Sequence, residues 1–285
     1  MAHGGPRLGH VPGRGCWVSE NDLDRLLEIA VTAAREAGRM LVQKRPPGRV
    51  QVLDTKSSPT DAVTAMDRAS EELITERIRA VRPQDGFLGE EGASSAGDSG
   101  VRWVIDPIDG TVNYLYDLPE WAVSIAAEVD GEIRVGVVLI PPRGEEYTAI
   151  LGGGAARGGE PIRCAPPPPL DQALVATGFG YSAARRAVQA EVLRGVITQV
   201  RDVRRGGSCA ADLCSLACGR VDAYYERGPQ YWDYAAAGLI AREAGARVGG
   251  LHGRPPSPDL VLAAPPGLFH DLHDLLATLD PERDA

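Results

Sequence analysis

Four acidic residues stand where predicted strands end or predicted helices begin, which are places where side chains from distant segments can converge. Glu90 follows a short apolar run in FLGEEG, Asp106 and Asp109 lie in WVIDPIDGT, and Asp233 opens a predicted helix in YWDYAAAG. A single acid in such a place is usually a helix cap or a turn residue. In WVIDPIDGT, however, a buried-looking strand leads into a turn that Pro107 restricts, so two carboxylates three residues apart can converge.

Carboxylates that cluster without histidine or thiolate favour hard, oxygen-seeking cations such as Mg²⁺. Gly110 leaves room for a ligand to approach the backbone, and Thr111 begins a predicted helix whose free N–H groups favour phosphate. Two metal ions that share one carboxylate can activate a water and stabilise the leaving oxygen. The residues therefore predict metal-assisted hydrolysis of a phosphate ester.

Composition and charge limit the possible classes of protein. The chain has 285 residues, of which 44% are hydrophobic and 24% charged, so it is expected to be globular with one large domain or two modest ones. Its net charge of −9 argues against binding to nucleic acid or to an anionic membrane, although bound metal ions would turn an acidic pocket into an anion receptor. No signal peptide, membrane span or CxxC pair is present, so we expect a cytoplasmic protein with reduced thiols.

Hydrophobic periodicity predicts helices and an antiparallel sheet in the first half of the chain and alternating strands and helices in the second. Residues 1–18 are expected to be a disordered tail, residues 19–164 an α+β half, and residues 165–285 an α/β half that begins at the proline tract 165–169. A capping box formed by Ser19 and Asp22 precedes the first helix. The predicted helices are 23–41, 64–79, 184–200, 208–219, 232–244 and 268–279, and the predicted strands are 86–88, 102–105, 121–129, 132–140, 173–177, 221–225 and 260–263, with hairpin turns at 130–131 and 158–159.

Four segments, in this order and spacing, resemble the inositol monophosphatase family, and the resemblance covers roughly residues 20 to 280. They are KSSPTDAVTAMD (56–67), GEEG (89–92), WVIDPIDGTVNY (103–114) and DAYYERGPQYWDYAAAG (222–238), and they are most similar to the bacterial, actinobacterial members. The resemblance implies a layered αβαβα sandwich, a homodimer, dependence on Mg²⁺ and inhibition by Li⁺. It also implies hydrolysis of inositol 1-phosphate by in-line attack of water, without a covalent phosphoenzyme.

The resemblance further implies a metal site with a shared ligand. Glu90, Asp106 and the carbonyl of Ile108 would bind a first metal ion. Asp106, Asp109 and Asp233 would bind a second, so that Asp106 bridges the two ions. Ile108, Asp109 and Asp233 would also contact the substrate.

Thr111 and Asp67 would orient and deprotonate the attacking water, while the backbone of Gly110 and Thr111 would hold the phosphate. Lys56 would lie near the metal site and temper the repulsion between carboxylates. Two simpler interpretations stay open, because Asp67 could only favour its helix N-terminus and Lys56 could be a solvated loop residue.

The substrate side of the implied site is defined less sharply. Glu226 would bind a substrate hydroxyl, and Arg204 would lie on the substrate side, with Arg205 as its immediate competitor for that role. No match to the family is found around 178–182 and 228–231, where the substrate wall is expected. The turn that lines the sugar side would consist of Gly207, Ser208 and Cys209.

Two further motifs and two further kinds of function compete with this interpretation. The string CSLACGR, from Cys214 to Arg220, fits the C-x₅-R motif of cysteine-dependent phosphatases, but Cys214 falls inside a predicted helix. DPIDGT resembles the DxDGT nucleophile motif of haloacid-dehalogenase-type phosphatases, but its acids are three residues apart instead of two. Histidinol phosphate, fructose 1,6-bisphosphate and nucleotide 3′-phosphates are the alternative substrates. A regulatory or RNA-associated scaffold without catalysis is the alternative of a different class.

Overall fold

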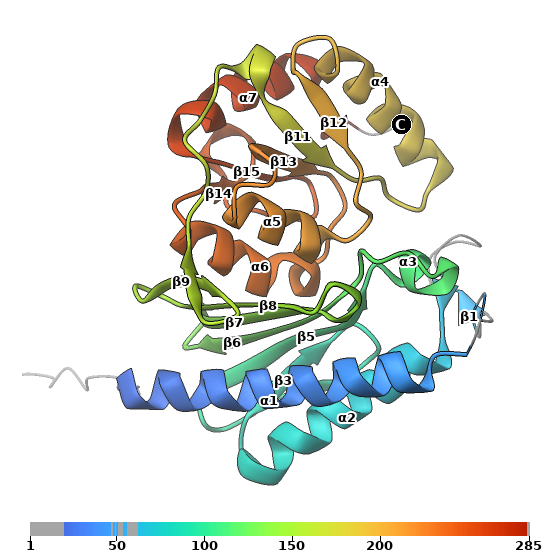
Figure 1. The fold of residues 1–285 in the computed structure, drawn as a ribbon, viewed down its shortest axis with the longest axis vertical. Helices are drawn as coiled ribbons and strands as arrows, with labels where there is room; N and C mark the ends of the chain where they lie inside the picture. Colours follow the sequence, from blue (N-terminus) through green and yellow to red (C-terminus); the bar gives the residue numbers. More distant parts are fainter. Residues whose placement is uncertain (1–19, 47, 49, 51–53, 56–61, 284–285) are drawn as a thin grey trace, which may run out of the picture.

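The protein is a sandwich of five layers, with helices outside two β-sheets and between them (Figure 1). The computed structural model describes residues 20–46, 48, 50, 54–55 and 62–283. The expected αβαβα architecture is confirmed. From one side to the other, the layers are α1 (Glu20–Lys44) with α2 (Ala65–Val81), an eight-stranded sheet, α5 (Cys209–Ala217) with α6 (Tyr231–Glu243), a five-stranded sheet, and α4 (Ala183–Val196) with α7 (Pro266–Leu279).

The larger sheet is mixed, because β3 and β5 are parallel while the other neighbouring strands are antiparallel. Its strand order is β10-β9-β8-β7-β6-β5-β3-β4. The strands are β3 (Gly86–Gly89), β4 (Ser94–Ser95), β5 (Val101–Asp109), β6 (Ala122–Val129), β7 (Glu132–Ile140), β8 (Glu145–Ile150), β9 (Gly154–Arg157) and β10 (Glu160–Ile162).

Strand β6 shows why this sheet is covered on both faces. Every residue of β6 is buried, and its side chains alternate between two cores, as the two-residue period of a strand requires. Val123 and Ile125 pack in the core beneath α1 and α2, while Ala122 and Ala126 pack in the core formed with α5 and α6. The turn to β7 has positive φ values at Asp130 and Gly131, which confirms the predicted hairpin.

The smaller sheet is also mixed, in the order β12-β11-β13-β15-β14. β11 is parallel to β12 and β13, whereas β15 is antiparallel to its two neighbours β13 and β14. The regular alternation of strands and helices predicted for this half missed the short strands β12 and β14. The strands are β11 (Leu174–Thr177), β12 (Asp202–Arg204), β13 (Ala223–Glu226), β14 (Arg247–Gly249) and β15 (Val261–Ala264).

The proline tract lies between the last strand of the larger sheet and the first strand of the smaller one. Nevertheless, α6 packs against both sheets and its buried alanines belong to one continuous core. A Cβ added to Gly136 of β7 would lie 2.7 Å from the carbonyl oxygen of Ala236, so glycine permits this close approach. The division into halves at 165 stays a prediction, and residues 1–18 and the Ser19 cap lie outside the described residues.

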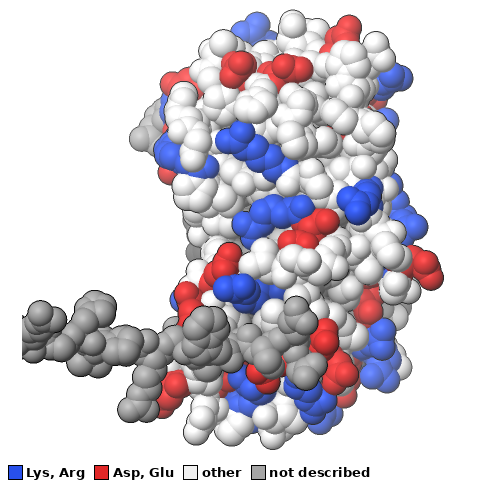
Figure 2. Space-filling view, turned by 90° about the vertical axis from the view of Figure 1, so that its left-hand side faces the viewer, with Lys and Arg blue, Asp and Glu red and all other residues white. Residues whose placement is uncertain are grey.

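The remaining elements are short. They are β1 (Asp54–Thr55), β2 (Ala62–Val63), α3 (Thr111–Tyr116) and the 3₁₀ turns η1 (Pro141–Arg143), η2 (Leu170–Gln172) and η3 (Leu251–Gly253). The helices that the structure describes and the face drawn in Figure 2 show neither a membrane span nor a single basic area. In the part of the chain that the structure covers, no helix is both long enough and apolar enough to cross a membrane. On the face drawn in Figure 2, acidic and basic side chains are interspersed, and they do not gather into one basic area.

Candidate metal centre and substrate cavity

Three aspartates from two elements meet at one point beside a cavity. Asp106 and Asp109 lie at the end of β5, Asp233 lies in the first turn of α6, and one carboxylate oxygen of each lies within 4.8 Å of the others. The structure therefore brings together the acids that the sequence singled out. Glu90, which directly follows β3, lines the same cavity.

A β-bulge, and not the predicted turn, brings the two aspartates of β5 together. Asp106 pairs with Ser124 and Asp109 with Ala122, so β5 spans three residues where β6 spans two. Without the extra residue, positions three apart would face opposite sides of the sheet. The bulge restores them to one side, and Pro107, which has no N–H to donate to the ladder, is suited to that place.

Burial and mutual repulsion oppose ionisation of this cluster. Burial raises the pKa of Asp106 well above its usual range, and the charges of Glu90, Asp109 and Asp233 raise it further. Burial likewise raises the pKa of Asp233, with Asp109 and Glu90 as the next causes. A cation held between these oxygens would remove the repulsion, and an all-carboxylate donor set is the kind that Mg²⁺ prefers.

Hydrogen bonds from backbone N–H groups and from the Ser208 hydroxyl hold the three carboxylates in position. Asp109 Oδ2 accepts from Ser208 Oγ at 2.5 Å and from the N–H of Ala210 at 2.6 Å, both at the start of α5. These bonds limit the effect of burial, which raises the pKa of Asp109 to about 6. Asp233 Oδ2 accepts from the N–H of Gln230 at 2.6 Å within the capping box of α6, and Asp106 Oδ1 accepts from the N–H of Ile108 at 3.1 Å.

Thr111 and Asp67 form the expected pair next to the cluster. The Thr111 hydroxyl lies 3.2 Å from Asp67 Oδ1 and 3.1 Å from the carbonyl oxygen of Ile108. Asp67 Oδ2 accepts from the N–H of Thr64 at 2.8 Å, which completes the capping box of α2. Asp67 therefore caps its helix with one oxygen and meets Thr111 with the other, while burial raises its pKa to about 6. Lys56 lies outside the described residues.

Gly110 permits the tight path between β5 and α3. It is the N-cap of α3 and has a φ of 91°, which non-glycine residues rarely adopt. A Cβ there would also lie 3.0 Å from the carbonyl oxygen of Glu120 and 3.1 Å from that of Gly207. The α3 N-terminus and the turn before α5 thus approach each other through backbone atoms.

The cavity beside the aspartates has a volume of about 480 Å³ and includes most of the predicted substrate residues. Ile108, Gly110, Gly207, Cys209 and Glu226 all line it. Ser208 does not line it, since its buried side chain holds Asp109 and caps α5.

Arg205 lines the cavity, whereas Arg204 does not, which corrects the preference given to Arg204. Arg204 is the last residue of β12, and its exposed side chain pairs with Asp202 at 2.6 Å on the same strand. Arg205 lies outside the strand, directly after it, and is the one of the two arginines that lines the cavity.

The wall of the cavity consists of segments 178–182 and 228–230, together with Arg185 of α4 and Trp232 of α6. The two segments lie where the sequence analysis expected the substrate wall without matching its residues to the family, whereas Arg185 and Trp232 were missed. The position of the two segments after β11 and β13 is a further signal, since loops after parallel strands lie at one edge of a sheet.

Glu226 lies at the end of β13 and faces this wall. Its Oε2 accepts a hydrogen bond from the Tyr224 hydroxyl at 2.8 Å, and burial raises its pKa to about 7. A Cβ added to Gly178 would lie 2.0 Å from the same oxygen, so only glycine fits beside this carboxylate. The arrangement offers a partly buried acceptor for a hydroxyl or amine of a ligand.

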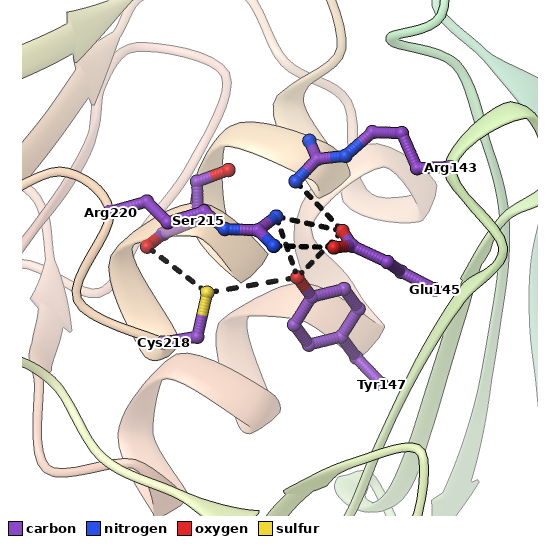
Figure 3. Close-up of polar contacts among 6 residues, drawn as sticks. All are labelled: Arg143, Glu145, Tyr147, Ser215, Cys218 and Arg220. Carbon is purple, nitrogen blue, oxygen red and sulfur yellow. Dashed lines mark hydrogen bonds and ion pairs between the residues drawn. The ribbon is translucent and has the colours of Figure 1, made fainter.

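The C-x₅-R string does not form a thiolate site. Cys214 is fully buried in the core between the sheets, and burial raises the pKa of its thiol. Arg220 instead donates to Glu145, which Arg143 approaches as well (Figure 3). The hydroxyl of Tyr147 lies between this group and Cys218, 3.7 Å from its Sγ. The arginine thus belongs to an ion-pair network and not to an anion-binding loop around Cys214.

Comparison with known proteins gives the same family that the four sequence segments resemble. The family model described as inositol monophosphatase family matches residues 22–279. Inositol-1-monophosphatase SuhB of Mycobacterium tuberculosis (strain ATCC 25618 / H37Rv) is 44% identical over 276 residues, which cover 89% of this chain and 93% of that protein. Nus factor SuhB of Escherichia coli (strain K12) is 39% identical over 231 residues, covering 80% of this chain and 86% of that protein.

A solved structure shares the fold as well. The crystal structure of extragenic suppressor protein suhB from Bartonella henselae matches with a TM-score of 0.83 at 34% identity, and the match covers 88% of this chain and 98% of that one. The family model, these relatives and the shared fold lead to one conclusion. The chain belongs to the inositol monophosphatase family.

Proposed function

We propose that this protein is a Mg²⁺-dependent phosphomonoesterase that hydrolyses inositol 1-phosphate to inositol and phosphate. The observation that carries the proposal is the convergence of Asp106, Asp109 and Asp233 within 4.8 Å at the edge of a cavity that is also lined by Thr111, the hydrogen-bond partner of Asp67. The family and its similarity to an inositol-1-monophosphatase support the same activity. By analogy with the family, we expect a cytoplasmic homodimer that Li⁺ inhibits.

The donor set fits Mg²⁺. Glu90, Asp106 and the carbonyl of Ile108 would hold one ion, and Asp106, Asp109 and Asp233 another. When bound, the ions would supply positive charge that lowers the pKa of a water and stabilises the charge on the leaving oxygen. The buried, mutually repelling carboxylates are consistent with this role because they gain most from a cation.

The chain's own residues would position and activate the water. The Thr111 hydroxyl, fixed by Asp67 Oδ1 and the Ile108 carbonyl, would orient the water in line with the scissile P–O bond. Asp67 would receive the proton through the threonine hydroxyl as the new P–O bond forms. The ester P–O bond would then break, and the leaving alcohol oxygen would take a proton from a solvent water, while Asp67 returns its own proton to solvent. Backbone N–H groups at Gly110 and Thr111 would hold the phosphate oxygens.

Glu226 supports a substrate that carries hydroxyl groups. Its Oε2 is already fixed by the Tyr224 hydroxyl, so the partly buried carboxylate is preorganised to accept hydrogen bonds from a polyol. Histidinol phosphate, fructose 1,6-bisphosphate and nucleotide 3′-phosphates are the alternatives within the same chemistry.

The test is phosphate release from inositol 1-phosphate, histidinol phosphate, fructose 1,6-bisphosphate and adenosine 3′,5′-bisphosphate. Each compound is assayed with Mg²⁺, with EDTA, and with Mg²⁺ plus Li⁺. We expect inositol 1-phosphate to give the highest kcat/KM, with no release in EDTA. A higher kcat/KM for another compound would make that compound the substrate in place of inositol 1-phosphate. Phosphate release that continues in EDTA would refute the metal-dependent mechanism.

A second candidate function comes from the names of relatives at 39% to 42% identity, which are called Nus factors. On that ground a regulatory or RNA-associated role beside catalysis is the alternative, although the net charge of −9 disfavours nucleic acid. RNA mobility-shift assays with the wild type and the Asp106→Asn variant would separate the two roles. RNA binding that is equal in both proteins would support a role independent of the metal site.

A further inference from the structure

Two arginines line the cavity without an ion pair or hydrogen bond to any residue in the described part of the chain. Arg185 lies in the first turn of α4, and Arg205 follows β12. The arginines next to them in the sequence do have partners, because Arg186 donates to the carbonyl of Gly180 and Arg204 pairs with Asp202. The two guanidiniums that face the cavity therefore keep their donors available for a ligand.

The two guanidiniums reach different parts of the wall. Nη1 of Arg185 lies 3.2 Å from where a Cβ of Gly228 would be, next to the segment that follows Glu226. Nη1 of Arg205 lies 2.6 Å from the corresponding position of Gly207, in the turn before α5. Arg205 is close enough to Glu226 to lower its pKa.

Positive charge exceeds negative charge in this part of the cavity. The acids that line the cavity are Glu90, Asp106, Asp109, Asp233 and Glu226, and the first four gather at the proposed metal site. Glu226 remains beside the arginines, and burial raises its pKa to about 7, so it is partly protonated near neutral pH. Asp212 of α5 is buried, and burial raises its pKa to about 8 although the charge of Arg205 lowers it. Both guanidiniums keep their charge at any such pH.

We propose that Arg185 and Arg205 form a second anion subsite, so that the preferred substrates among inositol phosphates are those that carry a further phosphate group. This inference rests on the proposed function and narrows its substrate class. The reacting phosphate would lie at the aspartate cluster, and the second anion would accept hydrogen bonds from the guanidiniums. A monophosphate of a neutral polyol would leave these donors without an anionic partner.

The test compares myo-inositol 1-phosphate with myo-inositol 1,4-bisphosphate in the presence of Mg²⁺. The proteins are the wild type, Arg185→Gln, Arg205→Gln and the control Arg194→Gln. Arg194 is an exposed residue of the same helix α4 that pairs with Glu191, so its replacement changes the net charge equally without touching the cavity.

For the wild type we expect a kcat/KM for the bisphosphate at least about tenfold above that for the monophosphate. Arg185→Gln and Arg205→Gln should each remove most of this preference, mainly through KM, whereas Arg194→Gln should keep it. An equal loss on both substrates would mean that the arginines only attract anions in general. That result, or a wild type without preference, would overturn the inference.

The inference and the proposed function can fail separately. Hydrolysis of the monophosphate without preference for the bisphosphate refutes the second subsite alone. If neither compound is hydrolysed, the proposed function fails, and calorimetric binding of both compounds to the same proteins decides the inference. Equal affinities, or a preference that both cavity variants retain, would then refute the subsite.

Discussion

Replacing Asp106 by asparagine should stabilise the metal-free protein while it abolishes turnover. The Asp106 side chain is 1% exposed, and its carboxylate meets two others within 4.8 Å. At an effective dielectric constant of about 20, two unit charges at that distance repel each other by roughly 3.5 kcal/mol. Since burial already keeps protons on part of the cluster, we expect a gain of about 2 kcal/mol in the free energy of unfolding, or about 5 °C in Tm.

The gain in the free energy of unfolding from Asp106→Asn should depend on pH. Burial raises the pKa of Asp106 in the folded protein well above its ordinary value of 3.8. Above that ordinary value, the folded state therefore holds more protons than the unfolded chain, and stability is lost as the pH rises toward the folded pKa. The asparagine variant lacks this group, so the difference between variant and wild type should be small near pH 4 and largest at about pH 8.

The assay is denaturant unfolding in EDTA at both pH values, with phosphate release in Mg²⁺ measured on the same preparations. Asp271→Asn is the control, because Asp271 is an exposed acid on α7. We expect turnover to fall by at least about 10³-fold in the Asp106 variant and to stay unchanged in the control. A variant less stable than the wild type in EDTA at the higher pH would refute the repulsion argument, and near-normal turnover would refute the metal assignment.

Three further replacements test separate parts of the site. Thr111→Val removes the hydroxyl that meets Asp67, so kcat should fall by about 10²–10⁴-fold while the midpoint of unfolding stays near that of the wild type. The control is Thr198→Val, at an exposed threonine, and an unchanged kcat in the Thr111 variant would exclude the pair from the reaction. Gly110→Ala places a Cβ 3.0 Å from a carbonyl oxygen at a φ of 91°, so the free energy of unfolding, measured with denaturant, should fall by about 2 kcal/mol or more. A fall of less than about 0.5 kcal/mol would contradict the close approach. Glu226→Gln should change the ranking of substrates in kcat/KM more than the rate on the best one, and an unaltered ranking would remove this residue from specificity.

The fold was predictable where the sequence carries a periodic signal. The hairpin of β6 and β7 follows from two apolar runs joined at Asp130–Gly131, and both turn residues have the positive φ that such a turn requires. β12 and β14 were missed because strands of three residues are too short to show alternation. Their pairing depends on neighbours far away in the chain.

The candidate site was likewise predictable only in part from the sequence. The aspartates were found because their spacing around Pro107 is unusual, although the bulge that aligns them becomes visible only in the pairing of β5 with β6. Arg204 was preferred to Arg205 for the substrate side but does not line the cavity, because the direction of a side chain at the end of a strand depends on sheet register, which the sequence does not reveal. Arg185 was missed for a related reason, since an arginine on a helix looks like a surface charge until the loop beside it is placed.

The measurement that tests the account most directly is a time course of phosphate release from inositol 1-phosphate by the metal-free wild-type protein. EDTA-treated enzyme receives Mg²⁺ midway through the reaction, in parallel with the Asp106→Asn variant. We predict no release before the addition, a steady rate after it, and no rate at any time with the variant. Release before Mg²⁺ is added, or an equal rate from the variant, would contradict the claim that the aspartate cluster holds the metal that this hydrolysis needs.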